Sequence, residues 1–170
     1  MIKLLRTIAR TGTLTEPPPP GASDIERLGP QIAAMIQKRF KGSLAIRQVD
    51  AGSCSACELE IHALGNPYYD ISRFGLHFVA SPRHADVLLV TGPVTTQMSE
   101  ALRRTYAATP DPKWVIASGD CADHCGLFGE DNYAVAGRVS EIVPVDLVIK
   151  GCPPAPVDLM RGLLQLLEGD

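Results

Sequence analysis

Short apolar runs alternate with helical patterns along most of the chain, from about residue 44 to the C-terminus. Continuous apolar runs between turn signals predict strands that are covered on both faces of a sheet. These strands are predicted at 44–49, 76–80, 87–91, 114–117 and 147–149. Helices are predicted at about 55–65, 95–108 and 154–168. The alternation predicts an α/β domain in which a parallel sheet has helices on both faces.

Local signals refine where the helices begin. The sequence Ser23-Asp24-Ile25-Glu26 has the S-x-x-E form of a helix start. Pro30 suits the first position of a following helix, which is predicted to end near Phe40. Thr95 or Thr96 is expected to cap the helix at 95–108, because a threonine hydroxyl accepts from the free N–H groups of a first turn.

Residues 1–22 differ from the remainder. Lys3, Arg6 and Arg10 carry three positive charges, and no acidic residue precedes Glu16. The apolar residues between them share one side of a helix, and a run of four prolines at 17–20 must be extended. We therefore expect a basic amphipathic arm and a proline spacer at 1–22, attached to a domain at 23–170. The arm is either an unattached tail or a segment that lies on a partner subunit or a membrane surface.

Composition excludes several classes of protein. Of the 170 residues, 45% are hydrophobic and 21% are charged, which fits a folded domain rather than a disordered chain. No apolar stretch approaches the roughly 18 residues of a membrane span. A net charge of −3 and an aromatic content of 5% argue against a nucleic-acid partner.

The chain has five cysteines, so they cannot all form internal disulfides. The first ten residues lack the apolar core and small-residue cleavage site of a secretory signal. A cytoplasmic protein that retains several cysteines commonly uses them for metal or redox chemistry. We therefore predict a cytosolic protein with a thiol-based site.

Four cysteines share one sequence setting. Cys54 and Cys57 form a C-x-x-C pair, while Cys121 and Cys152 each follow a predicted strand and a glycine. In an open parallel sheet the loops after the strands converge on one edge, so these thiols are expected to meet there. Nearby helix N-termini are expected to favour their thiolate forms.

Four thiolates fit either zinc or an iron–sulfur cluster. Structural zinc more often uses two close C-x-x-C pairs, so a pair plus two single cysteines favours the iron–sulfur interpretation. Zinc, in a stand-alone interaction module, and a thioredoxin-like C-x-x-C beside structural cysteines remain alternatives. Cys125 is interpreted as a small space-filling residue, with a substitute ligand or a redox-sensitive thiol as alternatives.

Four ordered motifs carry a family resemblance. They are Gly52-Ser53-Cys54-Ser55-Ala56-Cys57-Glu58-Leu59-Glu60, the segment 81–92, Gly119-Asp120-Cys121-Ala122, and the segment 144–154 that ends in Gly151-Cys152-Pro153-Pro154. Together they resemble the small, cluster-bearing subunit shared by group 4 membrane-bound [NiFe] hydrogenases and respiratory complex I. The resemblance covers roughly residues 44–168.

The resemblance implies a flavodoxin-like domain that holds one [4Fe–4S] cluster through Cys54, Cys57, Cys121 and Cys152. The cluster would pass electrons between the active site of a large subunit, which alone carries the Ni–Fe centre, and a ferredoxin-like subunit. The complex I branch typically has adjacent cysteines at the first position, so the C-x-x-C pair places this chain with the hydrogenases. The alternative is the complex I-type subunit, which passes electrons to quinone.

The resemblance also implies partners and a location. The partners are the hydrogenase or complex I-like large subunit, a multi-cluster ferredoxin-like subunit and membrane-arm subunits. The chain would be peripheral, through its complex, on the cytoplasmic side of the inner membrane. One departure is that the family often has paired glycines where this chain has Cys125-Gly126.

Other polar residues are weaker candidates. Glu58 and Glu60 are either helix-start charges favoured by the helix dipole or, for Glu58, a proton relay at the large-subunit interface. The four histidines are expected to be mostly surface or hydrogen-bonded groups; they are His62, His77, His84 and His124. His84 with Arg83, and also Arg73, are candidates for cations near the cluster that raise its potential.

Overall fold

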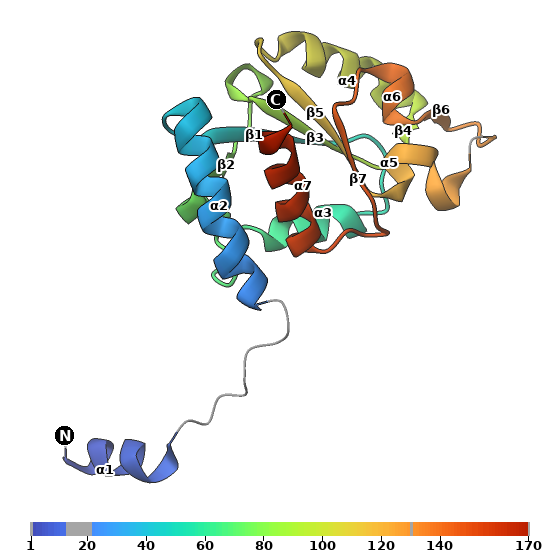
Figure 1. Ribbon diagram of the computed structural model, residues 1–170. Helices are drawn as coiled ribbons and strands as arrows, with labels where there is room; N and C mark the ends of the chain where they lie inside the picture. The colour runs from blue at the N-terminus through green and yellow to red at the C-terminus, as the bar shows by residue number, and fades with distance from the viewer. Residues whose placement is uncertain (1, 13–21, 130, 170) are drawn as a thin grey trace.

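A five-stranded parallel sheet forms the centre of the protein in the computed structural model, which describes residues 2–12, 22–129 and 131–169 (Figure 1). Its strands are β1 (Leu44–Asp50), β2 (Leu76–Phe78), β3 (Val87–Thr91), β5 (Trp114–Ser118) and β7 (Leu147–Ile149). They lie side by side in the order β2-β1-β3-β5-β7. Counting only these strands, the order is that of flavodoxin, as predicted. A short antiparallel pair, β4 (Val94–Thr95) with β6 (Val135–Gly137), lies beside the sheet.

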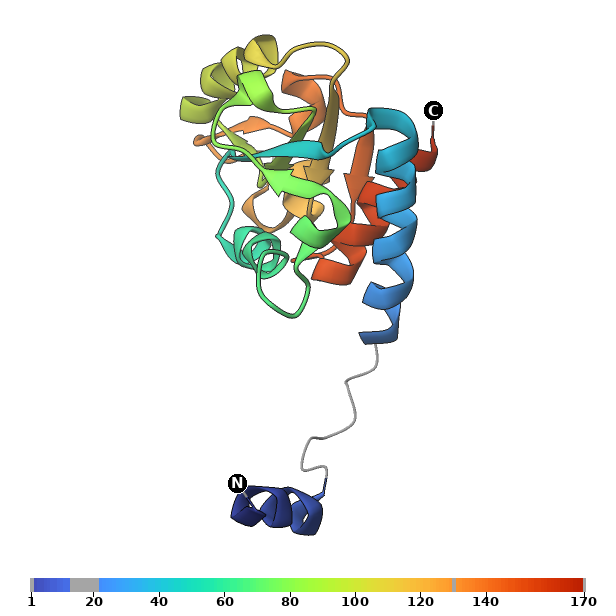
Figure 2. The same cartoon turned by 90° about the vertical axis from the view of Figure 1, so that its left-hand side faces the viewer.

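Helices cover both faces of the sheet, as Figure 2 shows. One face packs against α2 (Ala22–Phe40), α3 (Ala56–Ala63) and α7 (Pro156–Glu168), and the other against α4 (Thr96–Ala108), α5 (Asp120–His124) and α6 (Val139–Ile142). Alternate residues of β3 serve the two cores, because Leu89 packs with the first set and Leu88 with the second. Every residue of β3 is buried, which explains why the four residues before Thr91 are all apolar.

The prediction of a helix break at Pro30 is wrong, because α2 continues from Ala22 to Phe40 with Pro30 inside it. A proline within a helix removes one backbone hydrogen bond. Here Ile25, Leu28 and Ile32 are all buried in the same core on both sides of the proline. Continuous burial of this face against α7 offsets the lost hydrogen bond, so the tertiary packing overrides the local signal.

The other predicted elements are largely confirmed. Thr95 is the N-cap of α4, and its hydroxyl accepts from the backbone N–H of Met98 at 3.3 Å. Strand β2 ends at Phe78, two residues earlier than predicted. The pattern missed α5, α6, β4, β6 and the three 3₁₀ turns, η1 (Ile71–Phe74), η2 (Pro82–His84) and η3 (Gly126–Phe128). These elements are too short to produce a readable hydrophobic period.

Two aspartates, each directly before a strand, form hydrogen bonds with the backbone of the strand beside it. Asp86 Oδ2 accepts from the backbone N–H of Ala45 at 2.8 Å, while the Asp86 N–H donates to the Ala45 carbonyl. Asp146 repeats this reciprocal arrangement with Val115, at 2.7 Å from the Val115 nitrogen to Oδ2. The Ala45 and Val115 N–H groups lie one residue before the ladders that β1 forms with β3 and β5 forms with β7. Each aspartate carboxylate therefore accepts a backbone hydrogen bond that the ladder itself leaves unmade.

Replacement of Asp86 by alanine is expected to lower the free energy of unfolding by about 1–3 kcal/mol, because a part-buried N–H loses its acceptor. Asp86→Asn should retain most of the stability, because its side-chain oxygen still accepts. The control is Glu100→Ala, which breaks an exposed ion pair with Arg104 and is expected to cost less than about 1 kcal/mol. Urea unfolding checks the order; equal losses in Asp86→Ala and Glu100→Ala would contradict it.

The N-terminal arm is described in part. Residues Ile2–Thr11 form α1, and none of its residues is buried. The predicted proline spacer lies outside the described residues, so the expected division at residue 22 stays a prediction. Across the described residues, the helices are too short or too polar to span a membrane.

Candidate functional site

The loops that follow β1, β5 and β7 bring four cysteines to the carboxyl edge of the sheet. Cys54 lies in the loop after β1, and Cys57 lies in the first turn of α3. Cys121 lies in the first turn of α5 directly after β5, and Cys152 follows β7. All are free thiols. The four cysteines are therefore grouped at this edge, as predicted, by three separate loops.

The four thiols interact electrostatically. Burial, followed by the charges of Glu58, Cys121, Cys54 and Cys152, raises the pKa of Cys57 to about 12. Burial also raises the pKa of Cys121, partly opposed by a hydrogen bond from the Leu127 backbone N–H. For these two thiols desolvation and like charges disfavour the thiolate, and the expected contribution of the helix N-termini stays a prediction. Thiolates here require compensating positive charge.

A network of hydrogen bonds holds the first cysteine loop. Asp50 Oδ1 accepts from the backbone N–H groups of Gly52 at 2.9 Å and Ser53 at 3.0 Å. The Ser53 hydroxyl accepts from the Ser55 N–H at 3.0 Å and donates to Glu58. This Asx-type turn fixes the path of the chain just before the C-x-x-C pair.

Glu58 is buried rather than an exposed helix-start charge. Only 8% of its surface is accessible, and its two carboxylate oxygens accept from the hydroxyls of Ser53 and Thr91. Thr91 ends β3, so Glu58 ties α3 both to the loop before it and to the neighbouring strand. This gives Glu58 a positioning role beside Cys57, and its assignment as a proton relay stays a prediction.

Glycine is required where the β5 loop approaches Cys57. A methyl group added at Gly119 would lie 2.7 Å from the Cys57 Sγ, and the φ angle of Gly119 is +90°. Gly126 similarly approaches Cys121, whose Sγ would lie 2.6 Å from an added methyl group. The backbone thus packs directly against the sulfurs of Cys57 and Cys121. No side chain larger than that of glycine fits at positions 119 and 126 unless a sulfur moves.

The Cys121 and Cys152 loops are joined to each other. The carboxylate of Asp120 accepts from the Gly151 N–H at 2.8 Å, and the Asp120 N–H donates to the Gly151 carbonyl at 2.9 Å. The Gly119 N–H donates to the Ile149 carbonyl at 2.8 Å. These contacts fix the spacing of two cysteines that are 31 positions apart in the sequence.

Cys125 is fully buried and ends α5 in the left-handed conformation, with φ of +61°. Such a φ favours glycine, which accounts for the paired glycines that the resembled family has there. These observations agree with the interpretation of Cys125 as a packing residue.

Half of the cysteine site is open to the surface. Cys57 and Cys121 are buried, whereas Cys54 and Cys152 are exposed. Leu59, two residues after Cys57, is 68% exposed, and Leu127, whose backbone N–H donates to Cys121, is 91% exposed. Exposed apolar side chains close in sequence to two of the thiols favour a surface that another protein covers. No three His, Cys, Asp or Glu side chains of the described residues converge on a point that a single metal ion would occupy.

The cations suggested by the sequence do not lie at this edge. Arg83 and His84 form part of η2, directly before β3, and Arg73 lies in η1, directly before β2. These positions are at the amino ends of parallel strands, whereas the cysteines follow the carboxyl ends. Arg73 instead stacks over the ring of Phe74 at 4.6 Å. Strand direction, which a local motif does not encode, separates them from the site.

The remaining histidines are exposed. The Nδ1 atom of His124 contacts the Asp120 carbonyl, so that nitrogen carries the proton and donates. His77 lies on the edge strand β2. No histidine belongs to the cysteine site.

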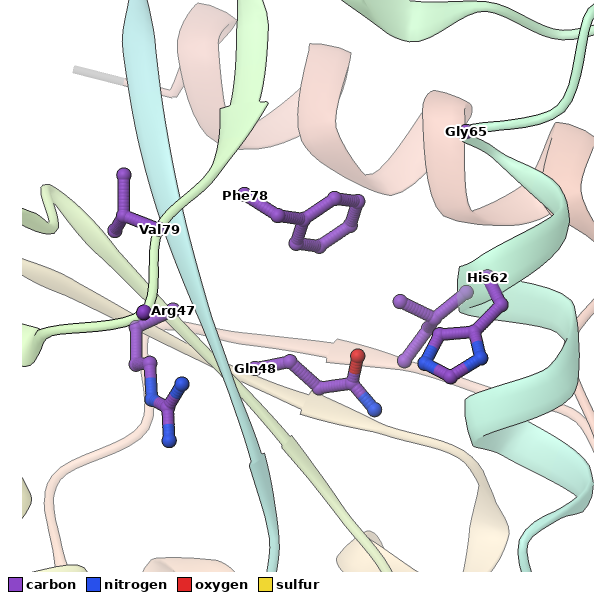
Figure 3. A pocket seen from close by; sticks show the side chains of 8 residues that line it. Arg47, Gln48, His62, Gly65, Phe78 and Val79 are labelled. Carbon is purple, nitrogen blue, oxygen red and sulfur yellow. The ribbon is translucent and has the colours of Figure 1, made fainter.

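A separate cavity of about 390 Å³ lies between α3, β1 and the end of β2. Figure 3 shows Phe78 and Gln48 extending toward His62 of α3 across this space. Its lining contains none of the four cysteines. The cavity is therefore a second surface feature, separate from the site at the carboxyl edge.

The sequence interpretation missed the residues that position the cysteine loops. Asp50, Ser53, Thr91 and Asp120 hold these loops through hydrogen bonds. The Asp50-Ala51-Gly52-Ser53 stretch is an Asx-turn pattern and was a usable signal. Thr91 and Asp120 had no local signal, because their partners are distant in sequence.

Comparison with known proteins places the site within a described family model. The model named NADH ubiquinone oxidoreductase, 20 kDa subunit, matches residues 54–166. The match begins at Cys54 and includes all four cysteines.

Three relatives show the range of assemblies in which similar chains occur. The probable membrane-bound hydrogenase subunit mbhJ of Pyrococcus furiosus is 44% identical over 147 residues, which is 86% of each chain. A B-type subunit of the NADH-quinone oxidoreductase of Herpetosiphon aurantiacus is 49% identical over 115 residues, covering 67% of this chain and 63% of that protein. A chain of the membrane-bound sulfane sulfur reductase, an archaeal respiratory membrane complex, superimposes with a TM-score of 0.67 and 35% identity, covering 79% of this chain and 73% of its own.

Proposed function

This chain belongs to the NADH ubiquinone oxidoreductase 20 kDa subunit family, and on that premise we propose that it is the electron-transfer subunit of a membrane-associated [NiFe] hydrogenase complex. It carries one [4Fe–4S] cluster, held by Cys54, Cys57, Cys121 and Cys152. The observation that carries the proposal is the grouping of four free thiols at one sheet edge by three separate strand-end loops.

The residues present fit an iron–sulfur cluster. Four thiolates are the usual ligand set of a [4Fe–4S] cluster, and this site offers four thiols without a disulfide. Burial raises the pKa of Cys57 and Cys121, so their thiolate forms need a nearby positive charge, which the iron ions of a cluster would supply. Each iron of a cubane takes one cysteine, so the four sulfurs need not converge on a single point as zinc ligands do.

The chain's own groups hold and shield this site. When bound, the cluster supplies reversible one-electron exchange. Gly119 and Gly126 bring backbone against two sulfurs, while Asp120 fixes the loop of Cys152. The buried pair Cys57 and Cys121 forms the inner side, and the exposed pair Cys54 and Cys152 faces outward. This orientation favours electron exchange with a protein that covers the outer side.

Two observations favour a hydrogenase over a quinone-reducing complex. The C-x-x-C spacing of Cys54 and Cys57 differs from the adjacent cysteines typical of the resembled complex I branch. The match with the hydrogenase subunit extends over 147 residues, against 115 for the quinone oxidoreductase subunit. In the proposed assembly the large subunit carries the Ni–Fe centre, because this chain offers no second cysteine pair.

The proposed partners follow from the same assembly. A large subunit covers the exposed side of the cysteine site, where Leu59 and Leu127 supply apolar contact area. A multi-cluster ferredoxin-like subunit and membrane-arm subunits complete the complex. The proposed location is peripheral to the membrane, on the cytoplasmic side of the inner membrane.

Anaerobic purification of the full chain tests the cluster. We expect about four iron and four sulfide per chain, the content of one cubane, and an EPR signal at low temperature after reduction. Zinc without iron, or no signal after reduction, would reject the electron-transfer function. Purification of the intact complex then tests the branch: nickel in the large subunit supports the hydrogenase, and nickel-free complex with quinone reductase activity supports the alternative.

A further inference from the structure

Helix α1 (Ile2–Thr11) separates its apolar and polar residues completely. On a helix with 3.6 residues per turn, its five apolar residues fall within an arc of about 160°. They are Ile2, Leu4, Leu5, Ile8 and Ala9. The other five fill the opposite arc of about 140°. They are Lys3, Arg6, Thr7, Arg10 and Thr11.

The apolar face of α1 is uncovered. Ile2 is 71% exposed, Leu4 64%, Leu5 59% and Ile8 56%. An isolated helix of fewer than about 12 residues is marginal in water, so α1 gains most of its stability from a surface that covers this face. The cysteine-bearing domain does not provide that surface, because no residue of α1 is buried.

The charge of α1 identifies the kind of surface. Three of the sixteen basic residues of the chain lie in α1, and none of its nineteen acidic residues does. The hydroxyls of Thr7 and Thr11 donate to carbonyls of the same helix, at 3.0 and 2.8 Å. The threonine hydroxyls are thus used within the helix, and the polar face offers mainly the positive charges of its lysine and arginines. Such a face suits an extended anionic surface better than a protein groove that requires specific hydrogen bonds.

We propose that α1 is an anchor that binds directly to the surface of an anionic lipid bilayer. Its apolar face enters the boundary between headgroups and acyl chains, and its three cations meet the anionic headgroups. The rest of the chain carries more acidic than basic residues, so the attraction is confined to this helix. The inference rests on residues 2–11 alone and not on the proposed electron-transfer function.

Flotation of the purified full chain with vesicles tests the anchor. We expect binding to vesicles of phosphatidylcholine mixed with phosphatidylglycerol, weaker binding at high salt, and little binding to phosphatidylcholine alone. The triple variant Lys3→Glu, Arg6→Glu, Arg10→Glu should lose at least about 100-fold in affinity, because each cation near such a surface contributes about fivefold. Leu5→Glu with Ile8→Glu should also abolish binding, by removing the inserted face.

A matched triple charge reversal provides the control. Arg83, Arg103 and Arg104 are exposed on the domain, so Arg83→Glu, Arg103→Glu, Arg104→Glu changes the net charge equally without touching α1. This variant should bind anionic vesicles at least several-fold more tightly than the α1 triple variant. Equal loss in both variants, no flotation of the parent chain, or a parent that binds neutral vesicles equally well would overturn the anchor. Iron content, measured in parallel, reports on the proposed function independently.

Discussion

Replacement of Cys121 by serine is expected to remove the native cluster and stop electron transfer through the assembled complex. Cys121 is buried beside Gly126, and its thiol interacts electrostatically with Cys152 and Cys54. Loss of a direct ligand should cost more than the about 10–100-fold in metal affinity that follows loss of an outer hydrogen bond. Iron and sulfide per chain, with EPR after anaerobic reduction, measure the loss.

The comparison variant is Cys125→Ser, which changes a cysteine only four positions away. Cys125 is buried and is the C-cap of α5, in the left-handed conformation, whereas Cys121 lies in the first turn of that helix. The Cys125→Ser variant should retain the iron content and the EPR signal of the parent chain, even if burial of the serine hydroxyl lowers the free energy of unfolding by about 1–3 kcal/mol. If Cys125→Ser loses the cluster while Cys121→Ser keeps it, the proposed ligand set is wrong. Circular dichroism of each variant distinguishes ligand loss from unfolding.

The second large effect is expected for Gly119→Ala. The added methyl group would lie 2.7 Å from the Cys57 Sγ, well inside van der Waals contact, and 3.4 Å from the Gly151 carbonyl. The sulfur must therefore move, and cluster content should fall at least about tenfold, in line with displaced metal ligands. The measured quantities are iron per chain and the EPR signal of the reduced protein.

Gly129→Ala separates this contact from backbone strain. Gly129 has φ 72° and ψ 155°, close to the φ 90° and ψ 156° of Gly119, so alanine is strained at both positions. The strain is about 1–3 kcal/mol in this region. No described atom lies within 4 Å of the methyl group that would be added at Gly129. Both variants should lose similar stability, but only Gly119→Ala should lose iron; a parallel loss would assign the effect to strain instead.

The fold was largely predictable because its signals are local. Buried strands of a parallel sheet are continuously apolar, and β3 shows this in its first four residues, all of them buried. The stop at Pro30 was a misleading local signal, since burial of Ile25 and Ile32 in one core carries α2 across it. Short elements such as α5 were missed, because one turn contains no period to read.

The candidate site was likewise predictable only where its signals are local in the sequence. Cysteines in the loops after parallel strands of one sheet reach the same edge, so the grouping of Cys54, Cys57, Cys121 and Cys152 was predictable from their places after predicted strands. The placement of Arg83 and His84 near them was wrong, because both residues precede their strand and lie at the opposite end. The role of Asp120 was not predictable, because its partner Gly151 is 31 residues away.

The sequence by itself determined the parallel sheet and the edge at which the thiols gather, because the alternation of strands and helices along the chain requires crossover connections and places the loops after the strands together. Only the tertiary structure decided which thiols are buried, how burial raises the pKa of Cys57, and where Gly119 must lack a side chain. Those features depend on atoms from distant segments packed within a few ångströms. Such contacts are set by how whole elements pack, and no local pattern encodes them.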